Sequence, residues 1–110
     1  MNITEREQGG VYIYALDGRI DTQGAVDVDL TLQSAVSGGK HKMILDMADV
    51  RYISSAGLRI LADVLTKNRD NGGDLKLVSL NPKVLRVFQI IGFDNFFSIY
   101  ENVDTALADF

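Results

Sequence analysis

Segments typical of β-strands alternate with segments of helical periodicity along almost the whole chain. The first two strand-like runs, residues 3–8 and 11–16, flank Gly9-Gly10 and predict an antiparallel hairpin. Helical stretches at about 24–37, 56–70, 82–91 and 103–110 are then separated by apolar runs at 42–47, 74–79 and 96–100. Strands that alternate with helices form largely parallel sheets with right-handed crossovers. We therefore expect one α/β domain over residues 1–110, with a mostly parallel sheet, an antiparallel N-terminal hairpin and the order β-β-α-β-α-β-α-β-α.

The composition argues against several classes of protein. With 46% hydrophobic and 24% charged residues, the chain should fold as a soluble globular protein. It contains no cysteine, so disulfides and thiolate chemistry are excluded. A net charge of −4 argues against nucleic-acid binding, and no apolar run approaches the ~20 residues of a membrane span. Because the first residues also lack a secretory signal pattern, the expected location is the cytoplasm.

Two junctions between a strand and a helix are the places where a site is expected. In open α/β sheets, sites form at the carboxyl ends of the strands. The first junction, "LDGRIDTQG", has a predicted turn at Asp17-Gly18, and Asp21 or Thr22 could cap the helix that follows. The second, "DVRYISSAGL", carries Ser54 and Ser55. We also expect Asp46 at the end of the strand over 42–47, bonded to backbone amides of the next loop.

The two serines allow a structural and a functional interpretation. One of them should cap the following helix, which stabilises it by about 1 kcal/mol. Gly57 is less easily explained, because glycine in a helix costs up to about 1 kcal/mol relative to alanine. It suits a surface that another backbone or a bulky group approaches closely. A helix N-terminus also tolerates a phosphate, which would add charge to a neutral interface and so switch binding.

The same stretch resembles the signature of a known family. "DVRYISSAGLRIL", preceded by the strand "MILDM", is similar to the corresponding segment of STAS domains, in particular the bacterial anti-sigma factor antagonists. Gly18, Ile20 and Asp21 in "GRID" match the family's Gly-x-Leu/Ile-Asp. The Ser-small-Gly-Leu piece is weakly specific alone. Its place after a buried strand, with "GRID" upstream in a chain of this size, makes the match strong. The hairpin, "GRID" and the order of helices and strands extend the resemblance over essentially residues 1–110.

The resemblance implies a phosphorylation switch. Ser55 matches the serine that the cognate anti-sigma factor phosphorylates; Ser54 is the second choice, since it stands where many members have aspartate. Ala56 stands where others carry a second serine. The implied partner-binding residues lie in two loops: Asp21, Thr22 and Gln23 in the first, and Ser54, Ala56, Gly57 and Leu58 in the second.

The implied partners are proteins. The anti-sigma factor of this family is an ATP-dependent serine kinase that also sequesters a sigma factor, and a phosphatase resets the antagonist. The resemblance therefore implies that this chain binds the kinase, releases the sigma factor and is inactivated by phosphorylation. It would be a substrate and not an enzyme, with no cofactor and no metal. The alternative within the same fold is a STAS adaptor subunit of a transporter or sensory complex that is not phosphorylated.

Other residues fit competing functions less well. The only histidine, His41, precedes the third strand, so we expect it solvated at the end opposite the serines, where it cannot complete a catalytic triad. No nucleotide-binding glycine fingerprint is present. Asp46 in "MILDM" is similar in position to the phosphoacceptor of two-component receiver domains, but the chain lacks the acidic pair and the lysine that such a domain needs. Arg51 and Arg59 flank the serine loop and could pair with a phosphate, although solvation is favoured. The aromatic residues near the end of the chain are expected to be mainly core: Phe88, Phe93, Phe96 and Phe97.

Overall fold

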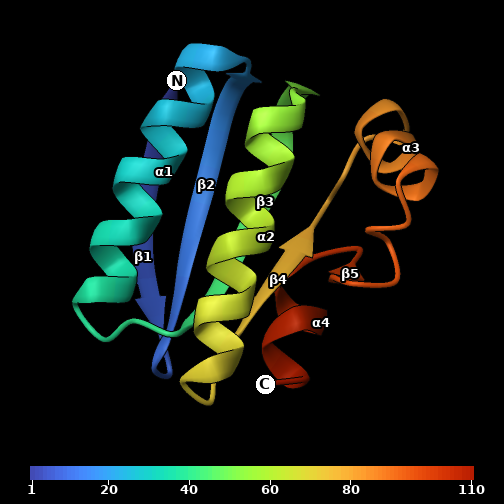
Figure 1. Cartoon of the computed structure of the whole chain (residues 1–110). Helices are drawn as coiled ribbons and strands as arrows, with labels where there is room; N and C mark the ends of the chain where they lie inside the picture. The colour runs from blue at the N-terminus through green and yellow to red at the C-terminus, as the bar shows by residue number, and fades with distance from the viewer.

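The computed structural model describes all 110 residues and confirms the predicted order of elements (Figure 1). In chain order these are β1 (Asn2–Gln8), β2 (Val11–Ile20), α1 (Thr22–Ser37), β3 (Lys42–Ile53), α2 (Ser55–Asp70), β4 (Asp74–Val78), α3 (Pro82–Ile90), β5 (Ser98–Tyr100) and α4 (Val103–Ala108). None of the four helices is both long enough and apolar enough to cross a lipid bilayer.

The five strands form one sheet in the order β1-β2-β3-β4-β5. β1 and β2 pair in antiparallel fashion, as the Gly9-Gly10 hairpin predicts, and every other neighbouring pair is parallel. The strand at the centre is β3, and its residues Met43, Ile44 and Leu45 are fully buried. The continuous apolar run over 42–47 suits this position, because a central strand is covered on both faces.

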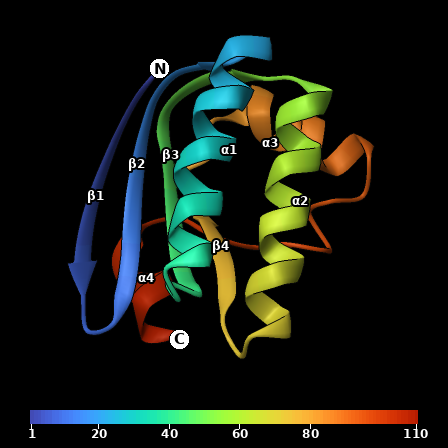
Figure 2. The same cartoon turned by 60° about the vertical axis from the view of Figure 1, so that its left-hand side comes forward.

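The helices cover the two faces of the sheet unequally. α1 and α2 lie side by side on one face, as Figures 1 and 2 both show, and bury the larger core of 21 residues together with part of α3. The other face is covered by α4, whose Ala106 packs on Val11, Ile13, Ile44 and Val78. α4 is only six residues long and leaves part of this face uncovered, since Ala15, which follows Val11 and Ile13 along β2, is exposed.

Two sequence predictions are wrong at the junctions. Asp17-Gly18 is not a turn: β2 runs on to Ile20, with shifts in register near Ala15–Asp17 and at Gly18, whose φ of +134° favours glycine. Asp46 does not end a strand either, because β3 continues to Ile53. Its Oδ1 does accept a backbone hydrogen bond, from the N–H of Ala48 at 3.1 Å, but within the strand. The extra residues of β2 and β3 pair with each other, as far as Ile20 opposite Ile53.

The aromatic segment divides between core and surface. β5 contains only Ser98–Tyr100, so Phe96 and Phe97 precede the strand. Phe88 and Phe97 are buried and meet edge to face, with ring centroids 5.6 Å apart. Phe93 is half-buried, whereas Phe96 is exposed. The prediction of a core role is confirmed for Phe88 and Phe97.

Candidate functional site

The two predicted loops meet at one end of the sheet. β2 and β3 end side by side, and the backbone N–H of Ser54 donates a 2.8 Å hydrogen bond to the carbonyl oxygen of Ile20. α1 and α2 each start directly after one of these strands, so their N-termini lie at the same end of the molecule (Figure 1). The parallel pairing of β2 with β3 thus brings Asp21 next to the serine loop, because the carboxyl ends of parallel strands lie at the same edge of the sheet.

Each helix has its own cap. The Asp21 carboxylate accepts from the Gly24 N–H at 2.9 Å, which resolves the choice between Asp21 and Thr22 in favour of Asp21. The Ser54 hydroxyl oxygen accepts from the Gly57 N–H at 3.1 Å, with the Ser54 backbone extended. Both residues therefore satisfy N–H groups that the first turn of a helix leaves without a partner.

Ser54 and Ser55 consequently differ in what their hydroxyls can do. Ser54 is half-buried and its side chain is engaged as the cap. Ser55 is the first residue of α2 and is exposed, and its hydroxyl makes no hydrogen bond within the protein. The free hydroxyl of the pair is thus that of Ser55.

Gly57 and Leu58 support the loop from inside. A Cβ atom on Gly57 would lie 2.5 Å from Cγ2 of Ile20 and 3.1 Å from Cγ1 of Ile53. The close approach predicted at Gly57 therefore exists, but the approaching group is the protein's own core and not something outside. Leu58 is only 6% exposed and belongs to the same core. Of the predicted partner-binding residues, these two have no side-chain surface to offer a partner.

The other predicted residues are accessible. Asp21, Thr22, Gln23 and Ser55 are exposed, and Ser54 and Ala56 are half-buried. Next to them is an open hollow of about 310 Å³, lined by Asp21 and Gln23 together with Met1, Gly18, Arg19, Gly24 and Arg51. Arg19 was missed by the sequence analysis, although it lies inside the "GRID" motif. Its guanidinium lies 4.5 Å from the centre of the Tyr52 ring, which extends the exposed surface of the site along β3.

The arginines that flank the serine loop have different surroundings. Arg51 forms a loose ion pair with Asp17, with 3.8 Å between Nη1 and Oδ1, and both side chains are exposed. It also lines a second open hollow, of about 480 Å³, with Asn81, Pro82 and Lys83 at the start of α3. Arg59 is exposed and forms no ion pair or hydrogen bond.

The only histidine lies far from this site. His41 lines a hollow at the opposite end of the sheet, with Gly10, Gly39 and Gly73 among its neighbours. The residue is half-buried and its Nδ1 is buried without a hydrogen-bond partner, so the prediction of a solvated side chain holds for only part of the ring. The reason is the neighbouring backbone: the Asp74 N–H donates to the His41 carbonyl oxygen at 3.0 Å, which holds the loop between α2 and β4 against His41. No group of three or more histidine or acidic side chains is placed to hold a metal ion.

Comparison with known proteins agrees with the fold. The family model described as the STAS domain matches residues 2–106. BtrV of Bordetella bronchiseptica, provisionally named an anti-sigma factor antagonist, is 34% identical over 110 residues, which cover 100% of this chain and 95% of that protein.

Solved structures share the whole architecture. The crystal structure of an anti-sigma factor antagonist from Mycobacterium paratuberculosis has a TM-score of 0.89 at 25% identity and covers 98% of this chain and 92% of that one. The phosphorylated form of the Bacillus cell fate determinant SpoIIAA has a TM-score of 0.76 and covers 98% of both chains, but at 14% identity it supports the fold alone. Since both the family model and BtrV match nearly the whole sequence, this chain belongs to the STAS domain family.

Proposed function

We propose that this protein is an anti-sigma factor antagonist that is switched off by phosphorylation of Ser55. The observation that carries the proposal is the exposed Ser55 hydroxyl, free of hydrogen bonds, at the start of α2 and beside the Asp21–Gln23 loop. The relatives named as antagonists support the general role. In the unphosphorylated state, the exposed residues of the two loops bind the anti-sigma factor, which then releases its sigma factor.

A phosphate at Ser55 is compatible with the fold. The first turn of a helix has free N–H groups, and the helix dipole favours negative charge there. The modified group would lie at the protein surface, since Ser55 is exposed. At a packed interface, however, the added charge of about −1.5 to −2 has to be desolvated or paired, which costs several kcal/mol. Partner binding is therefore lost while the domain stays folded.

Ser54 is the less suitable acceptor. Its hydroxyl oxygen already accepts the Gly57 N–H, and the residue is half-buried, with its backbone N–H bonded to Ile20 at the end of β2. A kinase would have to break the cap to reach it, and the phosphate would then need room inside the loop. Because Ser54 caps the helix and Ser55 has a free hydroxyl, Ser55 is the better candidate for the modified residue.

The remaining parts of the cycle follow from the same proposal. The anti-sigma factor is the serine kinase and uses ATP, a separate phosphatase removes the phosphate, and the cycle takes place in the cytoplasm. The chain itself acts as a substrate and a binding protein. No catalytic group of its own is required.

The test has two parts. The chain is incubated with lysate of its native host and Mg-ATP, and the phosphate is located by mass spectrometry, with Ser55→Ala and Ser54→Ala as matched controls. We expect one phosphate on Ser55, retained in Ser54→Ala and absent from Ser55→Ala. Lysate with active serine kinases that leaves Ser55 unmodified would instead favour an adaptor that is not phosphorylated.

The second part measures binding. Ser55→Asp should abolish capture of the host's anti-sigma factor in a pull-down while the melting temperature changes by less than about 2 °C, because surface substitutions usually stay within ±0.5 kcal/mol. Unchanged capture by Ser55→Asp would contradict the switch. A large loss of melting temperature would point to a structural role for Ser55.

A further inference from the structure

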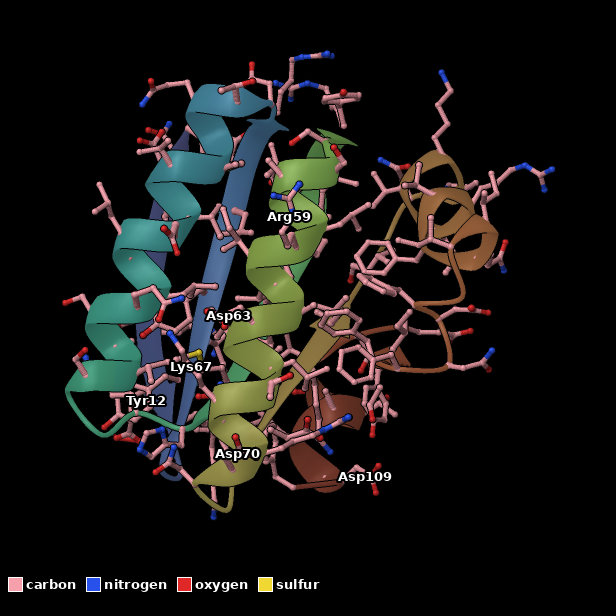
Figure 3. The ribbon with its side chains drawn as sticks, viewed as in Figure 1. Tyr12, Arg59, Asp63, Lys67, Asp70 and Asp109 are labelled. Carbon is pink, nitrogen blue, oxygen red and sulfur yellow. The ribbon has the colours of Figure 1, made fainter.

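Arg59 lies one helical turn after Ser55 on the outer surface of α2. Side chains four residues apart on a helix are neighbours, with Cβ atoms about 5–6 Å apart. Long helical side chains also lean toward the N-terminus, over the preceding turn. Figure 3 shows Arg59 in this orientation, with its nitrogen atoms on the side of the N-terminal end of α2, away from Asp63 and Lys67 further along the helix. The spacing and the direction of the side chain thus put the guanidinium within reach of a group attached to Ser55.

The carboxylate that could have paired with Arg59 is already occupied. Asp63 is four residues further along α2, but its Oδ2 accepts from the Gln33 side chain at 2.8 Å and lies 3.1 Å from the Lys67 ammonium. These contacts, the Gln33 hydrogen bond first, hold the pKa of Asp63 below its usual range, so its charge is already balanced. Lys67 also donates to the Gln33 side chain, so Asp63, Gln33 and Lys67 all contact one another.

The other arginines of β2, β3 and α2 contrast with Arg59. Arg51 pairs with Asp17, Arg69 pairs with Asp74 at 3.0 Å, and Arg19 stacks on Tyr52. Arg59 is the first arginine of α2 after Ser55, and its exposed guanidinium has no anion as a partner in the fold.

We propose that Arg59 is the intramolecular partner of a phosphate on Ser55, held by the guanidinium along the outer face of α2. This inference rests on the proposed phosphorylation of Ser55. An anion that precedes a cation by four residues is the favourable order on a helix, and a guanidinium can donate two parallel hydrogen bonds to a phosphate.

The pairing would increase the effect of phosphorylation on partner binding in two ways. A phosphate held by Arg59 stays over the first turn of α2 instead of rotating freely in water, so it occupies the surface beside Ala56. The same pairing neutralises the Arg59 guanidinium. A partner that met a free cation on α2 would then meet a bulky, anionic group in its place.

The experiment does not need a kinase. Phosphoserine is incorporated at position 55 of the full chain during translation, and its second ionisation, near pH 6 for phosphoserine, is followed by ³¹P NMR. Pairing with a cation favours the doubly ionised phosphate and lowers its pKa. We expect Arg59→Gln to raise the phosphate pKa by about 0.3 units, the size expected of an exposed pair at this spacing, and 1 M salt to remove most of the difference.

Arg69→Gln is the matched control. It removes the same charge from the same helix, but 14 residues further along (69 − 55), which is about 21 Å at 1.5 Å per residue. It should leave the phosphate pKa unchanged. Equal shifts in the two variants, or no shift in Arg59→Gln while both keep the wild-type circular dichroism, would overturn the pairing.

The outcome is separate from that of the proposed function. A phosphate pKa that depends on Arg59 supports the pairing even if the host lysate never modifies Ser55, in which case only the proposed function fails. If Ser55 is modified in lysate but the phosphate pKa is the same with and without Arg59, the proposed function is supported and the pairing fails.

Discussion

Replacing Gly57 with alanine tests whether this residue is required by the protein's own packing. The new methyl group would lie 2.5 Å from Cγ2 of Ile20 and 3.1 Å from Cγ1 of Ile53, and neither side chain has free space, since they are 0% and 4% exposed. α2 cannot easily move away either, because the Ser54 N–H is bonded to the Ile20 carbonyl. Overpacking of this kind costs about 1–3 kcal/mol, whereas alanine gains at most about 1 kcal/mol in helix propensity.

With overpacking at the middle of its range, about 2 kcal/mol, the two effects leave a net loss of about 1 kcal/mol. For a domain of this size, that lowers the melting temperature by about 4 °C or more, measured by circular dichroism, with an unchanged urea m-value. Gly38→Ala is the matched control, since the nearest atoms to its new methyl lie at 3.5 Å and its φ is −84°. It should change the melting temperature little.

A double-mutant cycle identifies the clash itself. Ile20→Ala removes the methyl group that Gly57→Ala would meet, so Gly57→Ala should cost less stability in the Ile20→Ala background than in the wild type. If Gly57→Ala is as stable as the wild type, or if its cost is the same in both backgrounds, the packing argument is wrong. Gly57 would then have to be explained by an external partner.

Three further results are expected. Ser54→Ala should lose about 1 kcal/mol of stability, or about 4 °C in melting temperature, because it removes the cap of α2, while Ser55→Ala should stay within about 0.5 kcal/mol. The hydrogen bond from the Tyr14 hydroxyl at 2.6 Å, followed by Lys40, holds the pKa of Glu5 below its usual range. Near pH 4 the native state therefore binds fewer protons than the unfolded state. The stability that ionised Glu5 contributes is fully present above the pKa of the unfolded state and is lost as pH falls through the pKa of the native state. In urea unfolding from pH 3 to 6, the free energy of unfolding should therefore rise less steeply with pH in Glu5→Gln than in the wild type. Lys76→Met removes a buried ammonium that donates at 2.6 Å to a carbonyl of the C-terminal segment, so stability should fall by about 2 kcal/mol and amide exchange should accelerate first in α4; equal protection of α4 in both proteins would contradict this.

The order of elements and the identity of the loops could be predicted because their signals are local. Gly9-Gly10 marks the hairpin, Asn81-Pro82 starts α3, and the spacing of apolar residues separates strands from helices. The resemblance at "GRID" and "ISSAGL" likewise depends on short stretches. The sequence by itself therefore determined the fold class and the two loops of the candidate site.

Other features depended on residues far apart in the chain. Asp17-Gly18 has the local character of a turn, but pairing with β3 keeps it in a strand. Why Gly57 is glycine and whether Arg59 already has an anion were decided by contacts between β2, β3, α1 and α2. The cap from the Gly57 N–H to Ser54 is local, but the hydrogen bond between the Ser54 N–H and Ile20 fixes where β3 ends and α2 begins, and so which serine is the cap. Hydrogen-bond and ion-pair partners are chosen by distance in space, which periodicity does not encode. The tertiary structure alone therefore separated the capping Ser54 from the free Ser55 and left Arg59 without a partner beside it.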